Sequence, residues 1–322
     1  MTQILEEQLG HGAVRDPHDP RDIHLHDIAG APTPFDWNKG FDIEKQLGIT
    51  IPVKNQMSSE SCVGQGWSYL MAVKNAQITG IYDEVSAKAI YSQIFLKPNG
   101  GANIRDGGLL LQNWGAVLEK IVNSHKTDGS VDEQFMEDTS WITPEIVVMA
   151  KNLMALSIAD VPTDIESWAC AIRDNGGIVF GVDGTNNGTW NSLEPQPPIG
   201  SPAWGHCLFG GKALTDNNSK SIKSPNSWGN LGGWQNFRQN WFDNTQYLFT
   251  AWTLIEKINK PKNMAYIIKD ANSASVGIWT PAANEIDFIS MCAKNGINIP
   301  QNPNGSVNWA KVNIQGKLTL NK

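Results

Sequence analysis

The sequence predicts an α+β fold in which a mainly helical half is followed by a half made of short strands. Between residues 61 and 79 the apolar side chains, among them Trp67 and Leu70, recur at helical spacing. Beyond about residue 160 the pattern changes. Residues 177–182 form a short run of branched apolar residues, which is typical of a buried strand. These two patterns indicate helices first and a sheet second.

Helices dominate the first half of the expected fold. They are predicted at residues 61–79, 85–95 and 109–122. Gly80 directly follows the first helix and fits the left-handed position that ends many helices. A loop joins the second and third helices, and it contains four glycines, Gly100, Gly101, Gly107 and Gly108.

Strands dominate the second half, after a short helix through Trp168 and Ile172. We expect them at residues 177–182, 207–209, 221–223 and 247–255, separated by Gly, Asn and Pro turns. The result is a helical lobe followed by a sheet lobe.

Composition divides the chain into an arm, a large domain and a small one. Residues 1–30 contain Pro17 and Pro20 among aspartates and histidines, which favours an extended arm. Residues 31–259 hold both the helical and the strand-rich halves. From residue 260 onward lysines outnumber acids, and a Lys-Pro-Lys sequence marks a linker.

The last segment, residues 260–322, is expected to be a small α+β accessory domain. Strands are predicted at residues 265–268 and 311–320, with a helix at residues 285–292. Its scattered lysines are typical of a solvated face, and it carries no recognisable catalytic set. We therefore expect it to dock a partner.

Charge and composition exclude several classes of function. The chain has 322 residues and a net charge of −7, which offers no general field for nucleic acid or an anionic membrane. No apolar run approaches the roughly 20 residues of a membrane span. Glu6 and Glu7 stand where a signal peptide needs positive charge, so we expect a cytoplasmic protein. Its four cysteines are expected to be thiols, Cys62, Cys170, Cys207 and Cys292.

Cys62 is the candidate nucleophile of a thiol enzyme. It stands at the start of the first predicted helix, where unpaired backbone N–H groups and the helix dipole favour a thiolate. Gln56 lies six residues upstream. Its side-chain amide and the Cys62 backbone N–H are expected to converge on one carbonyl oxygen and form an oxyanion hole.

His206 is the candidate acid and base. Four of the six histidines belong to the arm, and His125 lies in a polar turn, whereas His206 opens an apolar strand. Asn226 follows twenty residues later, and its amide oxygen is expected to orient the imidazole. The Trp228 indole is expected to keep water away from that hydrogen bond.

These residues together resemble the papain-like (C1-family) cysteine peptidases, from about residue 15 to about residue 258. The approach to the nucleophile is Pro-Val-Lys-Asn-Gln at residues 52–56, and Cys62, His206 and Asn-Ser-Trp-Gly at 226–229 follow in the family's order. His206 follows Cys62 within the roughly 130–150 residues typical of such enzymes. Residues 16–22 and 103–107 look closer to the bacterial branch of the family than to the animal or plant one.

The resemblance implies a two-lobed fold with a helical lobe and a lobe like an antiparallel β-barrel. It implies that Cys62, His206, Asn226 and Gln56 are catalytic. It also implies that a peptide or protein substrate binds beside Gly100, Gly101, Glu60 and Trp228. The Gly100–Gly101 segment is equally well interpreted as a plain loop or as the backbone that pairs with the substrate. Neither a cofactor nor a metal is expected, because no cluster of ligands surrounds His24 and His26.

Several residues depart from the family pattern. Met57 and Glu60 replace glycines beside the nucleophile, and Val63 replaces the aromatic residue that follows it. An anionic Glu60 close to Cys62 would raise the pKa of its thiol. Three functions therefore stay open. They are a cysteine-type endopeptidase, an inactive protein that uses the fold for binding or assembly, and a thiol amidase acting on cell-wall peptides. The arm is a candidate inhibitory segment over the cleft.

Overall fold

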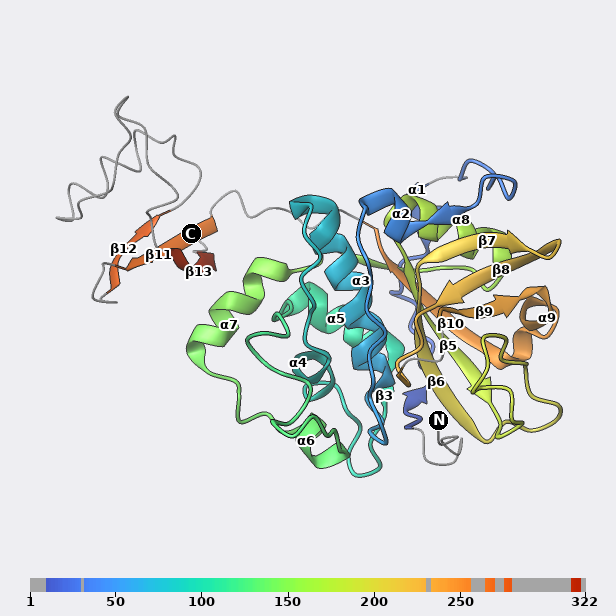
Figure 1. Cartoon of the computed structure of the whole chain (residues 1–322), viewed down its shortest axis with the longest axis horizontal. Helices are drawn as coiled ribbons and strands as arrows, with labels where there is room; N and C mark the ends of the chain where they lie inside the picture. Colours follow the sequence, from blue (N-terminus) through green and yellow to red (C-terminus); the bar gives the residue numbers. More distant parts are fainter. Residues whose placement is uncertain are drawn as a thin grey trace. The chain divides into compact units, whose positions relative to one another are not determined.

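The computed structural model describes residues 10–29, 32–229 and 233–255, and the backbone of three strands further on. Figure 1 shows the arrangement of these elements. The chain forms two compact units. The first contains residues 1–141 and 154–258, and the second contains residues 142–153 and 259–322.

The central helix of the first unit is α3, Cys62–Thr79, which confirms the helix expected at residues 61–79. It ends at Gly80, whose φ of 74° is left-handed as expected. Two glycines on this helix permit close packing. A Cβ on Gly64 would lie 2.6 Å from the Ala87 carbonyl oxygen, and one on Gly66 would lie 3.1 Å from the Cys207 sulfur. The start of α3 is thereby held against the neighbouring sheet.

The other two predicted helices differ in their bounds. In place of residues 85–95 the structure has α4, Ala87–Tyr91, and in place of residues 109–122 it has α5, Ile104–Asn113. Gly107 and Gly108 therefore lie in a helix and not in the expected loop. The reason is packing, because a Cβ on either glycine would come within 2.7 Å of the Trp67 ring. Gly115, with a φ of 98°, follows the end of α5.

Five further helices complete the helical elements of the first unit described by the structure, with one short 3-10 turn. The α-helices are α1 (Leu25–Ala29), α2 (Ile43–Leu47), α6 (Glu133–Glu137), α8 (Ile165–Asn175) and α9 (Gln239–Phe242), and the turn is Thr245–Tyr247. The helix expected through Trp168 and Ile172 is thus confirmed as α8.

Two four-stranded antiparallel sheets form the β part of the first unit. One has the order β4-β10-β5-β6, from Ile158–Asp160, Leu248–Leu254, Ile178–Gly184 and Trp204–Gly210. The other has the order β2-β7-β8-β9, from Phe41–Asp42, Lys212–Asp216, Ser219–Ser224 and Gln235–Arg238.

All four strands expected in the second half are present as β5, β6, β8 and β10. Strands β7 and β9 were not expected, because their sequences, Lys-Ala-Leu-Thr-Asp and Gln-Asn-Phe-Arg, carry too few apolar residues for a strand pattern. Pairing with β8 recruits both of them.

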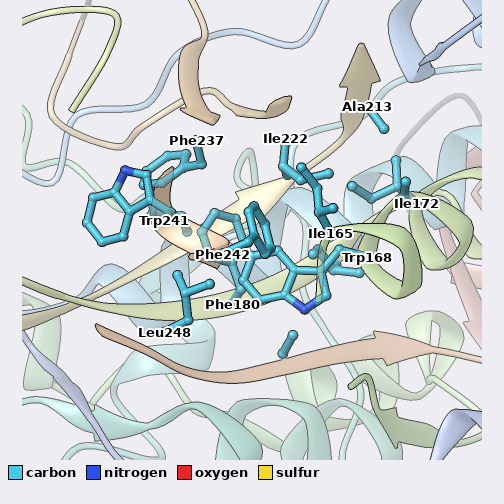
Figure 2. Packing of buried hydrophobic residues seen from close by; sticks show 14 of the residues in the cluster. Ile165, Trp168, Ile172, Phe180, Ala213, Ile222, Phe237, Trp241, Phe242 and Leu248 are labelled. Carbon is cyan, nitrogen blue, oxygen red and sulfur yellow. The ribbon is translucent and has the colours of Figure 1, made fainter. Parts of the chain in front are cut away.

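The main hydrophobic core lies between α8 and the two sheets. Trp168 packs with its ring centroid 4.8 Å from that of Phe180 and 5.0 Å from that of Phe242. Phe237 meets Phe180 edge-on and also contacts Trp241. Figure 2 shows these aromatic side chains gathered between the strands and α8. The core fixes β5 and β6, and with them the position of His206.

The arm is extended for most of its described length. Its strand β1, Ala13–Val14, pairs in parallel with β3, Ala102–Asn103, in the segment that follows Gly100 and Gly101. Cys62, Cys170 and Cys207, the cysteines within the described residues, are all free thiols, as expected.

The second unit contains a short helical segment and a small antiparallel sheet. The helices are α7, Pro144–Ala150, and the 3-10 helix η2, Lys151–Leu153. The sheet has the order β12-β11-β13, from Ser275–Trp279, Met264–Lys269 and Ile314–Thr319. Strands β11 and β13 overlap those expected at residues 265–268 and 311–320, whereas the helix expected at residues 285–292 lies outside the described residues.

Candidate active site

Cys62 is the first residue of α3 and is completely buried. The backbone N–H groups of Cys207, Gly12 and Val63 point at its sulfur. Cys207 directly follows His206 in β6, so α3 and β6 bring the thiol to the histidine's immediate neighbourhood. Among the described residues no hydrogen bond joins Cys62 to the His206 ring, and His206 Nδ1 has no partner.

The thiolate expected from the helix dipole is not favoured in this arrangement. Burial raises the pKa of the Cys62 thiol to about 12, and the nearby Glu60 adds to the rise. The three backbone N–H groups oppose this shift but do not outweigh it. Cys62 is therefore a neutral thiol while Gly12 covers it.

His206 and Asn226 meet as expected. His206 Nε2 lies 2.8 Å from Asn226 Oδ1, and Asn226 Nδ2 donates to Gln235 Oε1 at 2.8 Å. Gln235 Nε2 in turn donates to the carbonyl oxygens of Trp190 and Ser192, both at 2.8 Å. Because carbonyl oxygens only accept, the direction of the whole chain is set. His206 therefore carries its proton on Nε2 and leaves Nδ1 with a lone pair.

Trp228 covers the His206 ring. The two rings stack with centroids 4.1 Å apart and planes 19° apart, and His206 is fully buried. Burial lowers the pKa of His206 to about 3, although the hydrogen bond to Asn226 acts in the opposite direction. The imidazole is therefore neutral near neutral pH.

Gln56 lies at the expected place upstream of Cys62, with both ends of its amide engaged. Its Nε2 donates to the Ser59 carbonyl at 2.7 Å and to the Gly10 carbonyl at 3.2 Å, and its Oε1 accepts from Ser227 Oγ. Trp228 Nε1 also donates to the Gly10 carbonyl, at 3.1 Å. Two side chains of the candidate site thus converge on one peptide carbonyl of the arm.

The arm passes directly over the nucleophile. Gly10 N–H donates to the Met57 carbonyl at 3.0 Å, and Ala102 N–H donates to the Gly12 carbonyl at 2.7 Å. Between these two anchors the Gly12 N–H points at the Cys62 sulfur. The arm then continues as β1 along β3. The segment after Gly100 and Gly101 therefore pairs with a peptide, which is the arm itself.

Glycines permit this close approach from both sides. A Cβ on Gly10 would lie 1.8 Å from the Ser59 carbonyl oxygen, and one on Gly12 would lie 2.0 Å from that of Glu60. On the opposite wall, a Cβ on Gly205 would lie 2.3 Å from the Ala13 carbonyl oxygen. The arm fits here only because backbone packs directly on backbone.

His11 is the one arm side chain between these glycines. Its ring stacks on Trp204 with centroids 4.1 Å apart and meets Trp228 edge-on at 5.5 Å. Its Nε2 is buried and has no hydrogen-bond partner among the described residues. Burial lowers the pKa of His11 to about 4. The docked arm therefore holds a neutral imidazole.

Charged residues fasten the arm beyond the cleft. Asp16 accepts from the Arg105 backbone N–H at 2.9 Å and from Trp252 Nε1 at 2.8 Å. The Arg105 guanidinium reaches Asp22 at 3.0 Å. Asp16 and Asp22 of the arm are thus both bound by Arg105 of α5, and Asp16 is also bound by Trp252 of β10.

Glu60 lies two residues before Cys62 and is half-buried. Its Oε2 would be 2.6 Å from a Cβ on Gly100, and Glu133 Oε1 would be 3.2 Å from the same position. Burial and the neighbouring Glu133 and Glu137 raise the pKa of Glu60. Glu60 and Gly100 therefore lie together beside the nucleophile, next to a second carboxylate.

Sequence reasoning did not identify Gln235, Ser227, Glu133 or the Gly-His-Gly segment at residues 10–12. Ser227 belongs to the Asn-Ser-Trp-Gly motif, so that motif carried a usable signal. Gln235 and Glu133 stand in no motif, and only the fold brings them to the site. Within the described residues no group of three or more His, Cys, Asp or Glu side chains is arranged to hold a metal ion.

Comparison with known proteins gives likenesses of structure alone. No family model matches the chain, and a search of curated proteins gives no match. Xylellain, a cysteine protease from Xylella fastidiosa, is 19% identical with a TM-score of 0.61, covering 77% of this chain and 96% of that one. The proform of the ragweed cysteine protease Amb a 11 is 17% identical with a TM-score of 0.54, covering 70% and 67%.

A third solved structure, digestive procathepsin L 3 from Tenebrio molitor larval midgut, is 15% identical with a TM-score of 0.53 and covers 76% of this chain and 75% of its own. The fold is therefore that of the papain-like cysteine proteases, as the sequence resemblance implied, with helical and antiparallel β parts. Every helix in the described part of the chain is too short or too polar to traverse a bilayer.

Proposed function

We propose that this chain is a cysteine-type endopeptidase that hydrolyses peptide or protein substrates through Cys62, His206, Asn226 and Gln56. The observation that carries the proposal is the chain of hydrogen bonds from His206 to Gln235, which leaves His206 Nδ1 with a free lone pair. The backbone N–H of the next residue, Cys207, points at the Cys62 sulfur. Thiol hydrolysis requires an unprotonated imidazole nitrogen that can accept the proton of a nearby thiol, and here that thiol stands at the N-terminus of a helix.

In the proposed reaction His206 Nδ1 accepts the Cys62 thiol proton while the sulfur attacks a peptide carbonyl carbon. The new S–C bond turns the carbonyl oxygen into an oxyanion, and its collapse breaks the C–N bond. The amine leaves with the proton from His206. A water molecule then gives its proton to His206 and attacks the thioester, which releases the carboxylic acid and restores the Cys62 thiol.

Gln56 and the Cys62 backbone N–H are the proposed oxyanion donors. Support comes from Gln56 Nε2, which already donates to a peptide carbonyl oxygen, that of Gly10. Donors held by buried neighbours need no reorganisation when charge develops on the substrate oxygen. The Gln56 amide is held by Ser59 and Ser227.

The arm is proposed to inhibit this site by occupying it. The group that Gly12 presents to the sulfur is an amide N–H, which is not an electrophile, so the arm is held without a reaction at that atom. A substrate reaches Cys62 only when residues 10–14 leave. Their departure would also admit water and so remove much of the burial that raises the thiol pKa.

A direct test is covalent labelling with an epoxysuccinyl thiol-protease inhibitor, read by mass spectrometry of the intact chain and its peptides. Because the arm covers the thiol, the parent chain for this test carries Gly12→Ala, whose methyl group does not fit beside the Glu60 carbonyl oxygen. We expect one adduct, on Cys62. It should vanish when Cys62→Ala is added and form far more slowly with His206→Ala, whereas Cys170→Ala should label like the parent chain. Labelling of another cysteine, or equal labelling without His206, would overturn the proposal.

A catalytically inactive binding protein is the second candidate. The neutral thiol and neutral imidazole under the arm favour it, as does Glu60 beside the nucleophile. Release of the arm separates the two functions. Peptide hydrolysis that depends on Cys62 after release supports the peptidase. A chain that binds peptides but neither hydrolyses them nor labels at Cys62 supports the binding protein.

A further inference from the structure

Two carboxylates meet at the wall of the cleft beside the nucleophile. Glu60 Oε2 and Glu133 Oε1 both approach the position that a side chain on Gly100 would occupy, at 2.6 and 3.2 Å from it. Gly100 has a φ of 74°, which favours glycine, and any side chain there would displace the carboxylates. The glycine therefore keeps space for both acids.

Glu133 is fixed in place by its neighbours. One carboxylate oxygen accepts the Glu60 backbone N–H at 2.6 Å, and the other accepts the Tyr91 hydroxyl. The same Tyr91 oxygen accepts the Gly101 backbone N–H at 2.9 Å. This network ties Glu133 to both walls of the groove next to Cys62.

Glu60 has no such partner. Among the described residues, no hydrogen bond or salt bridge reaches its carboxylate. The charged groups that act on it are Glu133 and Glu137, which are both acidic, and the cation in this group, Lys97, acts on Glu137. A half-buried carboxylate beside a second one is an environment that a cationic group would stabilise.

A peptide already lies against this wall, so the acids are part of an occupied peptide groove. Gly12 packs on the Glu60 backbone and on Gly101 while its N–H points at the Cys62 sulfur. Any peptide residue brought to the sulfur must pass between the same two walls. The arm supplies Gly-His-Gly-Ala-Val at residues 10–14 and no cation for the two acids. Its next residue, Arg15, pairs instead with Asp183.

From this geometry we infer that Glu60 and Glu133 form a selectivity pocket for arginine or lysine at the substrate position whose carbonyl carbon is attacked, called P1. The inference rests on the proposed peptidase function and adds its substrate class. A P1 guanidinium or ammonium group would place its donors on the unpartnered Glu60 carboxylate and on Glu133. The arm leaves both acids without a cation, and a basic substrate would satisfy them.

The test compares two fluorogenic peptides that differ only at P1, one with arginine and one with its uncharged isostere citrulline. The chain used is full length and carries Gly12→Ala, whose methyl group does not fit beside the Glu60 carbonyl oxygen, so that the arm leaves the groove free. On this chain we expect kcat/KM to favour arginine by at least about tenfold, since charge-assisted hydrogen bonds give discrimination of that order. Glu60→Gln should bring the ratio close to one, and Glu133→Gln should lower it. Asp83→Asn removes a partly exposed carboxylate that pairs with Lys120 and contacts neither acid of the pocket, and it should leave the ratio unchanged.

The outcomes separate this inference from the proposed function. Hydrolysis of both peptides at equal rates, dependent on Cys62, overturns the pocket and leaves the peptidase. If neither peptide is hydrolysed by the Gly12→Ala chain and Cys62 is not labelled in it, the peptidase fails, and equilibrium binding of the same peptides to this chain with Cys62→Ala added then decides about the pocket. Tighter binding of the arginine peptide supports it. Equal binding of the two peptides overturns the pocket, and this measurement needs no substitution of Glu60 or Glu133 that could prevent folding.

Discussion

The hydrogen-bond chain behind His206 makes Gln235 a positioning residue for the proposed base. Gln235 is fully buried, and its two amide protons serve the carbonyls of Trp190 and Ser192. Replacing Gln235 with Glu removes these protons, so a carboxylate oxygen would face the two carbonyl oxygens with no hydrogen between them. We expect the carboxylate to move away from these carbonyls. The acceptor of the Asn226 Nδ2 hydrogen bond then moves with it, and the orientation of the Asn226 oxygen toward His206 Nε2 is no longer enforced.

We therefore predict that Gln235→Glu lowers kcat by roughly tenfold or more, since a buried unsatisfied polar group costs about 1–3 kcal/mol. The pH profile of kcat should shift as well, because the His206 environment changes. A purely structural role would lower the amount of folded protein and leave the profile of the remainder unchanged. Gln46→Glu, at an exposed position of α2, is the matched control.

His11 makes the docking of the arm dependent on pH. The free imidazole has a pKa near 6.5, and burial against Trp204 and Trp228 lowers it to about 4. Docking is therefore complete above pH 6.5 and weakens as the pH falls toward 4, because the proton binds only the undocked arm. The groups packed on this ring are the two indoles, and His206 lies beyond Trp228.

We predict that lowering the pH from 7.5 to 5 increases the accessibility of residues 10–14 to limited proteolysis several-fold. His11→Phe keeps the ring stacked on Trp204 but cannot take up a proton, so its accessibility should change much less. Mass spectrometry of the cleavage products measures both. An equal response in the wild type and His11→Phe would show that another group controls the arm.

The sequence allowed the four proposed catalytic residues to be named because each stands in a short recognisable context. Cys62 begins a periodic helix and Gln56 precedes it, while His206 stands in an apolar strand and Asn226 opens the Asn-Ser-Trp-Gly motif. Their actual protonation could not be predicted. It depends on Gly12, which lies fifty residues away in sequence and excludes water from the thiol.

At the scale of elements, the arm packs as an extended strand, and its close fit depends on glycines, which have no side chain. Gly12→Ala would place a methyl group 2.0 Å from the Glu60 carbonyl oxygen, which backbone packing on both walls cannot accommodate. The hydrogen bond from Ala102 to Gly12 and the pairing of β1 with β3 should then be lost together.

We predict that Gly12→Ala raises peptide hydrolysis at pH 7.5 by at least about tenfold, the effect of losing roughly 1.4 kcal/mol of docking free energy. Alkylation of Cys62 by iodoacetamide should accelerate too, because water then reaches the thiol and its pKa falls. Gly129→Ala is the control for a general loss of stability, because its methyl group meets no atom within 4 Å while the φ of 81° at this turn strains an alanine. Unchanged alkylation of Cys62 in Gly12→Ala would rule out the arm as the inhibitor.

The elements themselves were predictable where local pattern and tertiary packing agree. Helix α3 has both a periodic apolar sequence and a glycine stop. Helix α5 begins five residues before its expected start because Gly107 and Gly108, which weaken a helix locally, give space to the Trp67 ring. The packing that offsets the low helix propensity of these glycines comes from Trp67 on α3, so it could not be predicted from the local sequence of α5.

At the scale of the molecule, burial of the site under the arm determines the charge state of both reacting groups. The same loss of water raises the pKa of Cys62 and lowers that of His206. A neutral pair needs no counter-charge, and it can be stored in the interior at little electrostatic cost. Low pH therefore lowers the free energy of unfolding, because His206 takes up a proton more readily in the unfolded chain than in the folded one.

We predict that stability falls as the pH drops below 6.5, with a slope that depends on His206. The unfolded chain protonates this histidine near pH 6.5, whereas the folded chain does so only at about 3. Its contribution is therefore complete above 6.5 and declines by about 1.4 kcal/mol per pH unit down to 3. At pH 4.5 the loss is about 2–3 kcal/mol.

Urea unfolding at pH 7.5 and 4.5, followed by tryptophan fluorescence, measures this loss. His206→Gln keeps a polar side chain beside Asn226 and has nothing to titrate, so its unfolding free energy should fall less between the two pH values. Other groups titrate identically in both proteins and cancel in the comparison. The same pH dependence in both would mean that His206 is as easily protonated in the folded chain as in water, and the neutral, arm-covered pair would have to be abandoned.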